Sequence, residues 1–169
     1  MLLQASNLFR MPVASMDDNA KVGVVRTVLV DKKVLVVSGF LIRTGNFLFG
    51  KNLLLSCVDI LDIDRNGIVV KNSKNLVDPN EVVRIKEMLD EKFNLFGMRA
   101  RTKTKKNLGK ISDFVVETTT LQIVKFYIHG ILEDRIIDIS KVKKVSDKEI
   151  IFDDDIEMPT VSATEQASV

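Results

Sequence analysis

The side chains best suited to catalysis in this sequence are few and far apart. Among 169 residues there is one histidine, His129, and one cysteine, Cys57. A nucleophile needs a base within hydrogen-bond reach, and usually a third group that orients that base. Nothing in the sequence places such partners beside either residue. We therefore expect His129 to be a structural or exposed residue at a strand end, Cys57 to be a small core residue, and the protein not to be an enzyme.

The sequence also lacks the usual patterns of metal and cofactor sites. Asp59, Asp62 and Asp64 lie close together, but they lack the oxygen-rich loop of a calcium site, so we interpret them as a solvated strand edge. No glycine-rich phosphate loop occurs. One histidine and one cysteine cannot build a Cys/His zinc site. The sequence therefore predicts no metal and no cofactor.

The densest group of functional-looking side chains is a basic cluster that begins at residue 99. In an extended chain, alternate side chains point to the same side, so four cations would form a row with a spacing of about 6.6–7 Å, comparable with successive phosphates of a nucleic acid. No aromatic residue lies inside the cluster to stack on bases. We call the whole group the basic strip: Arg99, Arg101, Lys103 and Lys105 in the row, with Lys106 and Lys110 beside it.

Two interpretations of the basic strip stay open. It binds RNA or an acidic protein surface, or it is a solvated hairpin whose charge improves solubility or pairs with acidic residues. The distribution of charge supplies such residues, because residues 94–152 carry 12 Lys and Arg against 7 Asp and Glu, whereas residues 153–169 carry none against 5. The two segments could screen each other.

A second candidate site is the apolar loop Phe47-Leu48-Phe49, which lies between Gly45 and Gly50. Apolar side chains at a glycine-bounded tip either fold back over the protein or stay exposed to a partner. We expect Phe47 and Phe49 to fold back. A membrane surface anchored through them is the weaker alternative.

The elements that must position these side chains are short strands, and their pattern occurs twice. Runs rich in Val, Ile and Leu alternate with turn residues such as Asn66-Gly67, and several strands in about 65 residues are typical of a small barrel or sandwich. Matching landmarks in the same order predict a duplication. The landmarks are residues 7–11 and 94–98, residues 22–25 and 108–111, and residues 68–70 and 150–152.

One segment between the two copies predicts a helix. Asp78-Pro79 has the acceptor and the proline of a helix start, and apolar residues follow on one helical face at Val82, Ile85, Leu89 and Phe93. We expect a helix over 79–92 whose apolar stripe packs on one or both copies, because monomers rarely leave large apolar faces bare.

The residues of the first copy resemble a PRC-barrel domain. The resemblance lies in the opening residues 2–13, Gly23 with a strand that ends at Asp31, the glycine-bounded loop 45–50 and the closing element 58–70. The second copy keeps most of these features but lacks the glycine-bounded loop. The family consists of small β-barrels, found in the cytoplasmic part of the photosynthetic reaction-centre H subunit and in a ribosome maturation factor. The resemblance implies this fold and a non-catalytic docking role, and it supplies no catalytic residues.

These features together predict a mainly all-β protein: two tandem small PRC-type β-barrels (1–77 and 94–153) joined by one α-helix (78–93), with a disordered acidic C-terminal tail (154–169). We expect a docking or adaptor module that binds a protein partner through its barrel surfaces. The alternative is an accessory factor in RNA processing or ribosome assembly, with RNA or a ribonucleoprotein on the basic strip. No signal peptide or membrane span is recognisable, so we expect a cytoplasmic protein without membrane contact. The oligomeric state stays open.

Overall fold

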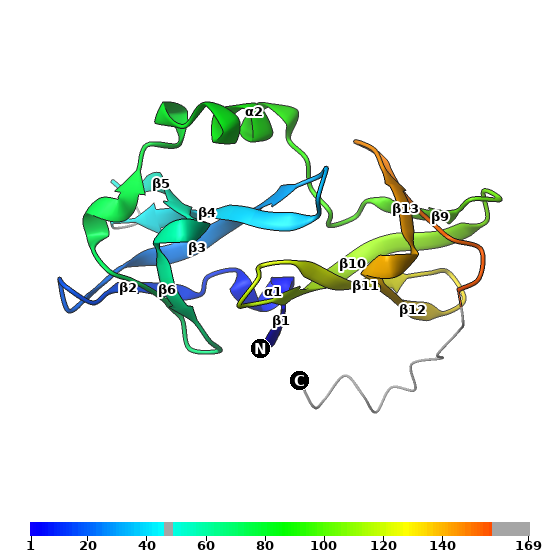
Figure 1. Cartoon of the computed structure of the whole chain (residues 1–169), viewed down its shortest axis with the longest axis horizontal. Helices are drawn as coiled ribbons and strands as arrows, with labels where there is room; N and C mark the ends of the chain where they lie inside the picture. The colour runs from blue at the N-terminus through cyan, green and yellow to red at the C-terminus, as the bar shows by residue number, and fades with distance from the viewer. Residues whose placement is uncertain (46–48, 157–169) are drawn as a thin grey trace. The chain divides into compact units, whose positions relative to one another are not determined.

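The computed structural model describes residues 1–45 and 49–156, and strands dominate this part of the chain. The strands form two curled sheets (Figure 1). The chain divides into two compact units: unit 1 consists of residues 1–93 and 116–122, and unit 2 of residues 94–115 and 123–169. No helix in the described residues is long and apolar enough to cross a membrane.

Within the described residues, unit 1 contains a seven-stranded sheet in the order β6-β7-β2-β3-β4-β5-β8. Neighbouring strands are antiparallel except β2 and β7, which are parallel. A short strand, β1 (Leu2–Gln4), and a single helical turn, α1 (Ala5–Leu8), precede the sheet. The strands are β2 (Pro12–Ser15), β3 (Ala20–Asp31), β4 (Val36–Thr44), β5 (Lys51–Ser56), β6 (Ile60–Ile63), β7 (Ile68–Val70) and β8 (Leu76–Val77).

The core of unit 1 lies inside the curl of this sheet. Phe40 and Ile42 alternate on β4 and are fully buried, as the period of two along a strand requires. Val13 of β2 and Ile68 of β7 are also fully buried and stand opposite each other in the parallel pair. The alternation of buried and less buried side chains along these strands thus places one face of each strand in a common core.

The predicted helix is present, but it is divided into two parts. A 3₁₀ turn at Pro79–Glu81 is followed by extended backbone at Val82, and α2 begins at Val83 and ends at Glu91. The side chain of Asp78 accepts a hydrogen bond from the backbone N–H of Asn80 (2.9 Å). This cap closes the 3₁₀ turn and not the α-helix, so a single helix over 79–92 is wrong.

The apolar stripe of α2 packs on the sheet of unit 1, which confirms that prediction. Ile85 is 5% exposed and clusters with Leu29 of β3 and Leu54 of β5. Val82 and Leu89 are half-buried against the same cluster. The helix therefore contributes to the core of unit 1.

Unit 2 contains a sheet with the order β13-β14-β9-β10-β11-β12. This is the order of β6-β7-β2-β3-β4-β5, and the one parallel pair recurs between β14 and β9. Among the described residues of unit 2, no strand corresponds to β8. The strands are β9 (Arg99–Thr102), β10 (Asn107–Glu117, whose last two residues belong to unit 1), β11 (Ile123–His129), β12 (Asp134–Asp138), β13 (Val142–Val145) and β14 (Glu149–Phe152).

The turns before β4 and β11 have the same geometry in both halves. Leu35 and Leu121 have left-handed backbone, with φ of 53° and 58°. Each donates its backbone N–H to the carbonyl of an acidic residue four positions earlier, Leu35 to Asp31 (2.8 Å) and Leu121 to Glu117 (2.7 Å). Because of these turns, β4 begins at Val36 and β11 begins at Ile123.

Residues 116–122 complete unit 1. The backbone N–H of Val37 donates to the carbonyl of Leu121 (2.9 Å), and Val36 and Gln122 form an isolated antiparallel bridge. The turn that follows β10 is thus hydrogen-bonded to the beginning of β4. Unit 1 is therefore built from two separate segments of the chain.

Candidate functional site

The basic strip begins as predicted and then turns. On β9, Arg99 is exposed, Arg101 is half-buried, and the alternate residues Ala100 and Thr102 are buried. The strand ends at Thr102, whose backbone N–H donates to the carbonyl of Lys106 (3.0 Å). The predicted row of four cations is therefore wrong beyond Arg101.

The turn after β9 explains this difference. Lys105 adopts left-handed backbone (φ 67°), and its N–H donates to the carbonyl of Thr102 (2.9 Å). Lys103 and Lys105 accordingly lie in the turn that leads to β10, and they do not extend the strand. A run of alternating residue types cannot reveal such a reversal, because lysine and threonine are compatible with both conformations.

Neighbouring strands place charges of both signs beside the arginines. Arg99 stands opposite Lys110 of β10 on one side and Glu149 of β14 on the other. The Nε of Arg101 lies 3.7 Å from a carboxylate oxygen of Glu149. This Nε is buried and makes no hydrogen bond within the part of the chain that is described.

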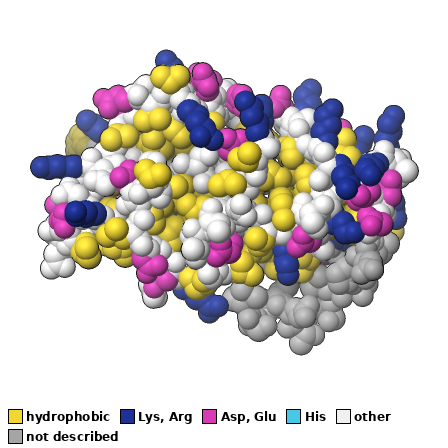
Figure 2. All heavy atoms as spheres, in the orientation of Figure 1, with side chains coloured by type: hydrophobic (Ala, Val, Ile, Leu, Met, Phe, Trp, Pro, Cys, Tyr) yellow, Lys and Arg dark blue, Asp and Glu magenta, His cyan; other side chains and the backbone are white. Residues whose placement is uncertain are grey.

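Acidic residues that follow β14 bind the turn of the basic strip. One carboxylate oxygen of Asp153 lies 2.9 Å from Nζ of Lys103, and the other lies 2.8 Å from Nζ of Lys143. Asp154 accepts hydrogen bonds from the backbone N–H (3.1 Å) and the hydroxyl (2.7 Å) of Thr104. We call Asp153 and Asp154 the acidic clasp. Figure 2 shows Lys, Arg, Asp and Glu side chains intermingled over this end of unit 2.

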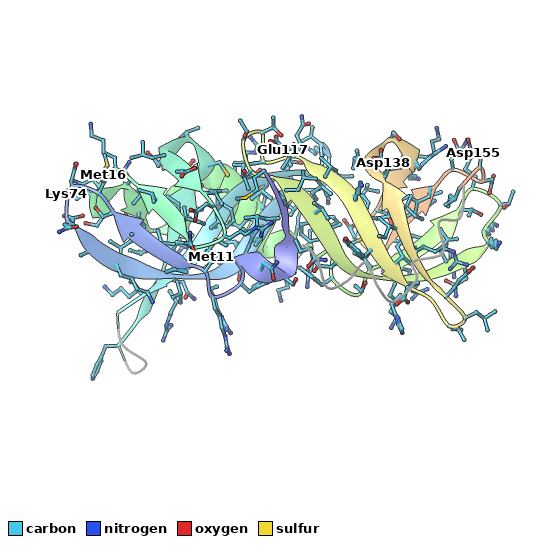
Figure 3. The ribbon with its side chains drawn as sticks, turned by 90° about the horizontal axis from the view of Figure 1, so that it is seen from below. Met11, Met16, Lys74, Glu117, Asp138 and Asp155 are labelled. Carbon is cyan, nitrogen blue, oxygen red and sulfur yellow. The ribbon has the colours of Figure 1, made fainter. Side chains whose placement is uncertain are left out.

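The hydrogen bonds of the acidic clasp change the titration of its members. The bond from Lys143, and then the bond from Lys103, hold the pKa of Asp153 far below the ordinary value of 3.8. The same contact raises the pKa of Lys143. The hydroxyl of Thr104 is the first cause of the lowered pKa of Asp154. Asp155, the next residue, lies 3.0 Å from Lys141 and is labelled in Figure 3.

Unit 1 holds the corresponding turn by a similar contact, but the acidic residue lies in the turn itself. Here the acid, Asp18, follows β2, and it accepts hydrogen bonds from the hydroxyl of Ser15 (2.5 Å) and the backbone N–H of Ser73 (2.9 Å). Met16 and Lys74, labelled in Figure 3, lie at this end of unit 1. In both units, hydrogen bonds join the turn after the equivalent strands β2 and β9 to the residues that follow β7 and β14. The acidic clasp therefore has a structural role.

The clasp leaves only part of the basic strip unpaired. Arg99, Lys105, Lys106 and Lys110 are exposed, and none of them makes an ion pair with the described residues. Lys103 is held by Asp153 and Arg101 lies near Glu149. The interpretation in which the basic hairpin pairs with acidic residues thus applies to two of the six residues.

His129 and Cys57, the two residues whose side chains are best suited to catalysis, lie in ordinary structural settings. His129 ends β11 and is 74% exposed, and its Nδ1 lies 2.7 Å from a carboxylate oxygen of Asp134. The Cys57 thiol donates to the carbonyl of Val37 (3.2 Å). Burial raises the pKa of this thiol to about 12, so it stays protonated and is a poor nucleophile near neutral pH. No cluster of three metal-binding side chains occurs in the described part of the chain.

The glycine-bounded loop differs from the expectation where it is described. Phe47 lies outside the described residues. Phe49 is 81% exposed, so the prediction that it folds back is wrong. The hairpin of β4 and β5 ends at the pair Thr44 and Lys51, and Phe49 lies beyond this pair.

The structure shows a second apolar loop that the sequence analysis missed. Ile131 and Leu132 lie between β11 and β12, and they are 93% and 97% exposed. We call these two residues the apolar tip. They occupy the hairpin that corresponds to the loop 45–50 of unit 1. The signal in the sequence is the pair of apolar residues directly after Gly130, between two strands of the second copy.

The base of the apolar tip is fixed by the polar residues around it. Arg135 donates to the carbonyls of Leu108 (3.2 Å) and Glu133 (3.4 Å), and it also forms an ion pair with the Glu133 side chain. A Cβ at Gly130 would lie 2.5 Å from the carbonyl oxygen of Glu133, so the chain packs closely here. The tip is thus presented from a well-defined turn.

A comparison with protein families agrees with the architecture of unit 1. Residues 2–77 match the family model of the PRC-barrel domain. A PRC-barrel domain is thus detected at residues 2–77. The PRC-barrel match ends with β8, so it includes all strands of unit 1 that precede α2. It confirms the resemblance for this range and does not extend to the second half. Among curated proteins, none gives a significant match to the chain.

Proposed function

We propose that the protein is a non-catalytic docking module, in which unit 2 is a second PRC-type barrel and binds a protein partner through the apolar tip. The common strand order and the equivalent parallel pair support a second barrel. The observation that carries the docking role is the exposure of Ile131 and Leu132. Covering such a side chain contributes about 1.5–3 kcal/mol.

A protein partner fits the surroundings of the tip better than a membrane does. Glu133 and Asp134 follow the tip directly, and Asp134 is exposed. Anionic lipid headgroups would repel these carboxylates, whereas membrane-binding segments carry Lys and Arg. Single exposed apolar residues are ordinary on protein surfaces, but two adjacent ones on a fixed turn are suited to a complementary apolar pocket.

An RNA-binding accessory role is the second candidate. It is supported by four exposed cations that make no ion pair with any residue that the structure describes: Arg99, Lys105, Lys106 and Lys110. The acidic clasp weakens it, because Asp153 and Asp154 bring negative charge to the same turn. Non-specific binding to nucleic acid depends on the number of phosphates that are neutralised.

The docking proposal is tested with a double variant, Ile131→Ser with Leu132→Ser. The matched control is Val58→Ser with Val83→Ser, which removes two exposed apolar residues from unit 1. Each protein is used to capture partners from native lysate, with and without nuclease. We expect a set of proteins that the wild type and the control retain, that the tip variant loses, and that nuclease does not release. Equal retention by the tip variant contradicts the proposal, and release by nuclease favours the RNA role.

A further inference from the structure

The two sheets differ at one pair of equivalent edges. In unit 1, the outer edge of β5 is covered by β8, in which Val77 stands opposite Leu54 and Leu76 opposite Leu55. In unit 2, the corresponding strand is β12. It pairs with β11 on one side and is the last strand of the sheet on the other, within the described residues (Figure 1).

The register identifies the residues of β12 that correspond to the covered part of β5. Leu55 pairs with Phe40 of β4, and Ile137 pairs with Phe126 of β11. Leu55 and Ile137 are both buried. After each strand comes a 3₁₀ turn of three residues, Cys57–Asp59 in unit 1 and Ile139–Lys141 in unit 2. Ile136 and Ile137 therefore occupy the positions of Leu54 and Leu55.

The edge of β12 lacks two of the features that prevent strand addition, proline and bulges. Natural edge strands are protected by short length, charged side chains, proline or bulges. β12 contains no proline, and its register with β11 is continuous over five residue pairs. Its exposed acids, Asp134 and Asp138, stand at its two ends. Its third charged residue, Arg135, is half-buried and donates to the carbonyls of Leu108 and Glu133. An edge of this kind offers unpaired N–H and C=O groups to an incoming strand.

We propose that the outer edge of β12 accepts an extended segment of the partner protein as an added antiparallel strand. This inference rests on the proposed docking function and names its mode. The segment carries two adjacent apolar residues, as Leu76 and Val77 do on β5. Basic residues beside them complement Asp134 and Asp138, as Lys74 precedes the apolar pair in unit 1. One residue, Glu133, separates the apolar tip from β12, so the two surfaces are continuous.

The test uses the full chain and a peptide with the sequence of residues 72–78, which includes β8. The backbone amides of the ¹⁵N-labelled protein are followed by NMR during titration with this peptide. We expect shifts along residues 134–138 and slower hydrogen exchange at those of their amides that point away from β11. A control peptide that is N-methylated at the position of Leu76 or of Val77, whichever amide faces the added strand, binds about tenfold more weakly, because it loses a main-chain hydrogen bond.

Each alternative result overturns the inference in a distinct way. Equal binding of the native and both N-methylated peptides shows that the side chains, and not the edge, are recognised. Shifts confined to residues 131 and 132 leave the docking function intact but remove strand addition. Slow exchange of the outward amides of β12 before any peptide is added shows that the edge is already covered. Protection that is independent of protein concentration indicates another part of the chain. Protection that rises with protein concentration indicates a second copy.

Discussion

Arg10 and Gly97 occupy the same position in the two halves of the chain. Both have left-handed backbone, with φ of 63° and 78°. Arg10 donates its backbone N–H to the carbonyl of Val25, and Gly97 donates to that of Ile111, each over 2.8 Å. A left-handed backbone is unfavourable for residues other than glycine, so its recurrence at one position is a strong sign of duplication.

This equivalence predicts that Gly97 can be replaced. A Cβ added at Gly97 would meet no atom within 4 Å, and unit 1 carries an arginine at the corresponding position. Gly97→Ala should therefore lower the free energy of unfolding by only about 1 kcal/mol, the cost of the left-handed backbone. Gly109→Ala is the contrasting variant, because its Cβ would lie 2.1 Å from the carbonyl oxygen of His129. Chemical denaturation should show a loss of several kcal/mol for Gly109→Ala, and similar losses for both would contradict the equivalence.

The packing of α2 predicts a second pair of variants. Ile85 is buried against Leu29 and Leu54, whereas Val83 of the same helix is 73% exposed. Ile85→Ala should destabilise the protein by about 2–4 kcal/mol, because it removes buried methyl groups and leaves a cavity. Val83→Ala should change the stability by less than about 0.5 kcal/mol. An unchanged thermal midpoint for Ile85→Ala would show that α2 is not part of the core.

The acidic clasp predicts a dependence of stability on pH. The folded-state pKa of Asp153 is lowered by Lys143 and Lys103, so its stabilisation is present above 3.8 and is lost as the pH falls through the lower folded value. Asp153→Asn should lower the thermal midpoint at pH 7, and its difference from wild type should shrink progressively below pH 3.8. Asp62→Asn, at an exposed position of β6, is the control. A difference that stays constant in acid would rule out the clasp as its cause.

The unpaired cations predict the outcome of an RNA titration. If docking to protein is the function, the wild type should show no binding to labelled single-stranded RNA even at about 50 mM salt, where phosphate contacts are strongest. The comparison is a variant with glutamine at all four unpaired positions, Arg99, Lys105, Lys106 and Lys110. Wild-type binding that the variant loses, with a log–log salt slope flattened by about 0.7 for each lost contact, would favour the RNA role instead.

The regular features of the fold could be predicted from the sequence. Strands such as β3 and β14 contain runs rich in Val, Ile and Leu next to turn residues, and the stripe of α2 has the period of a helix. The repeat predicted the common strand order, because landmarks in the same order imply the same topology. These signals are local or repeated, so a single sequence contains them.

The candidate surfaces were harder to predict, because they depend on contacts between distant segments. The distribution of charge allowed pairing between the basic strip and residues 153–169. It did not identify Asp153 as the partner of Lys103, 50 residues earlier, or the end of the strand at Thr102. The open edge of β12 is recognised only by comparison with β5. The strand β8 covers the edge of β5, and it has no counterpart in the described part of unit 2. The exposure of Phe49 and of the apolar tip likewise depends on where the hairpins end.

Site-specific photocrosslinking in cells tests the docking role most directly. A photoreactive phenylalanine analogue replaces Ile131 (93% exposed) in one variant and Val58, an apolar residue of unit 1 that is 88% exposed, in the other. We predict that the residue at 131 forms a discrete covalent adduct with one protein, that nuclease treatment leaves this adduct intact, and that the residue at 58 forms none. No adduct at 131, or the same adducts at both positions, would contradict the assignment of the apolar tip as the docking surface.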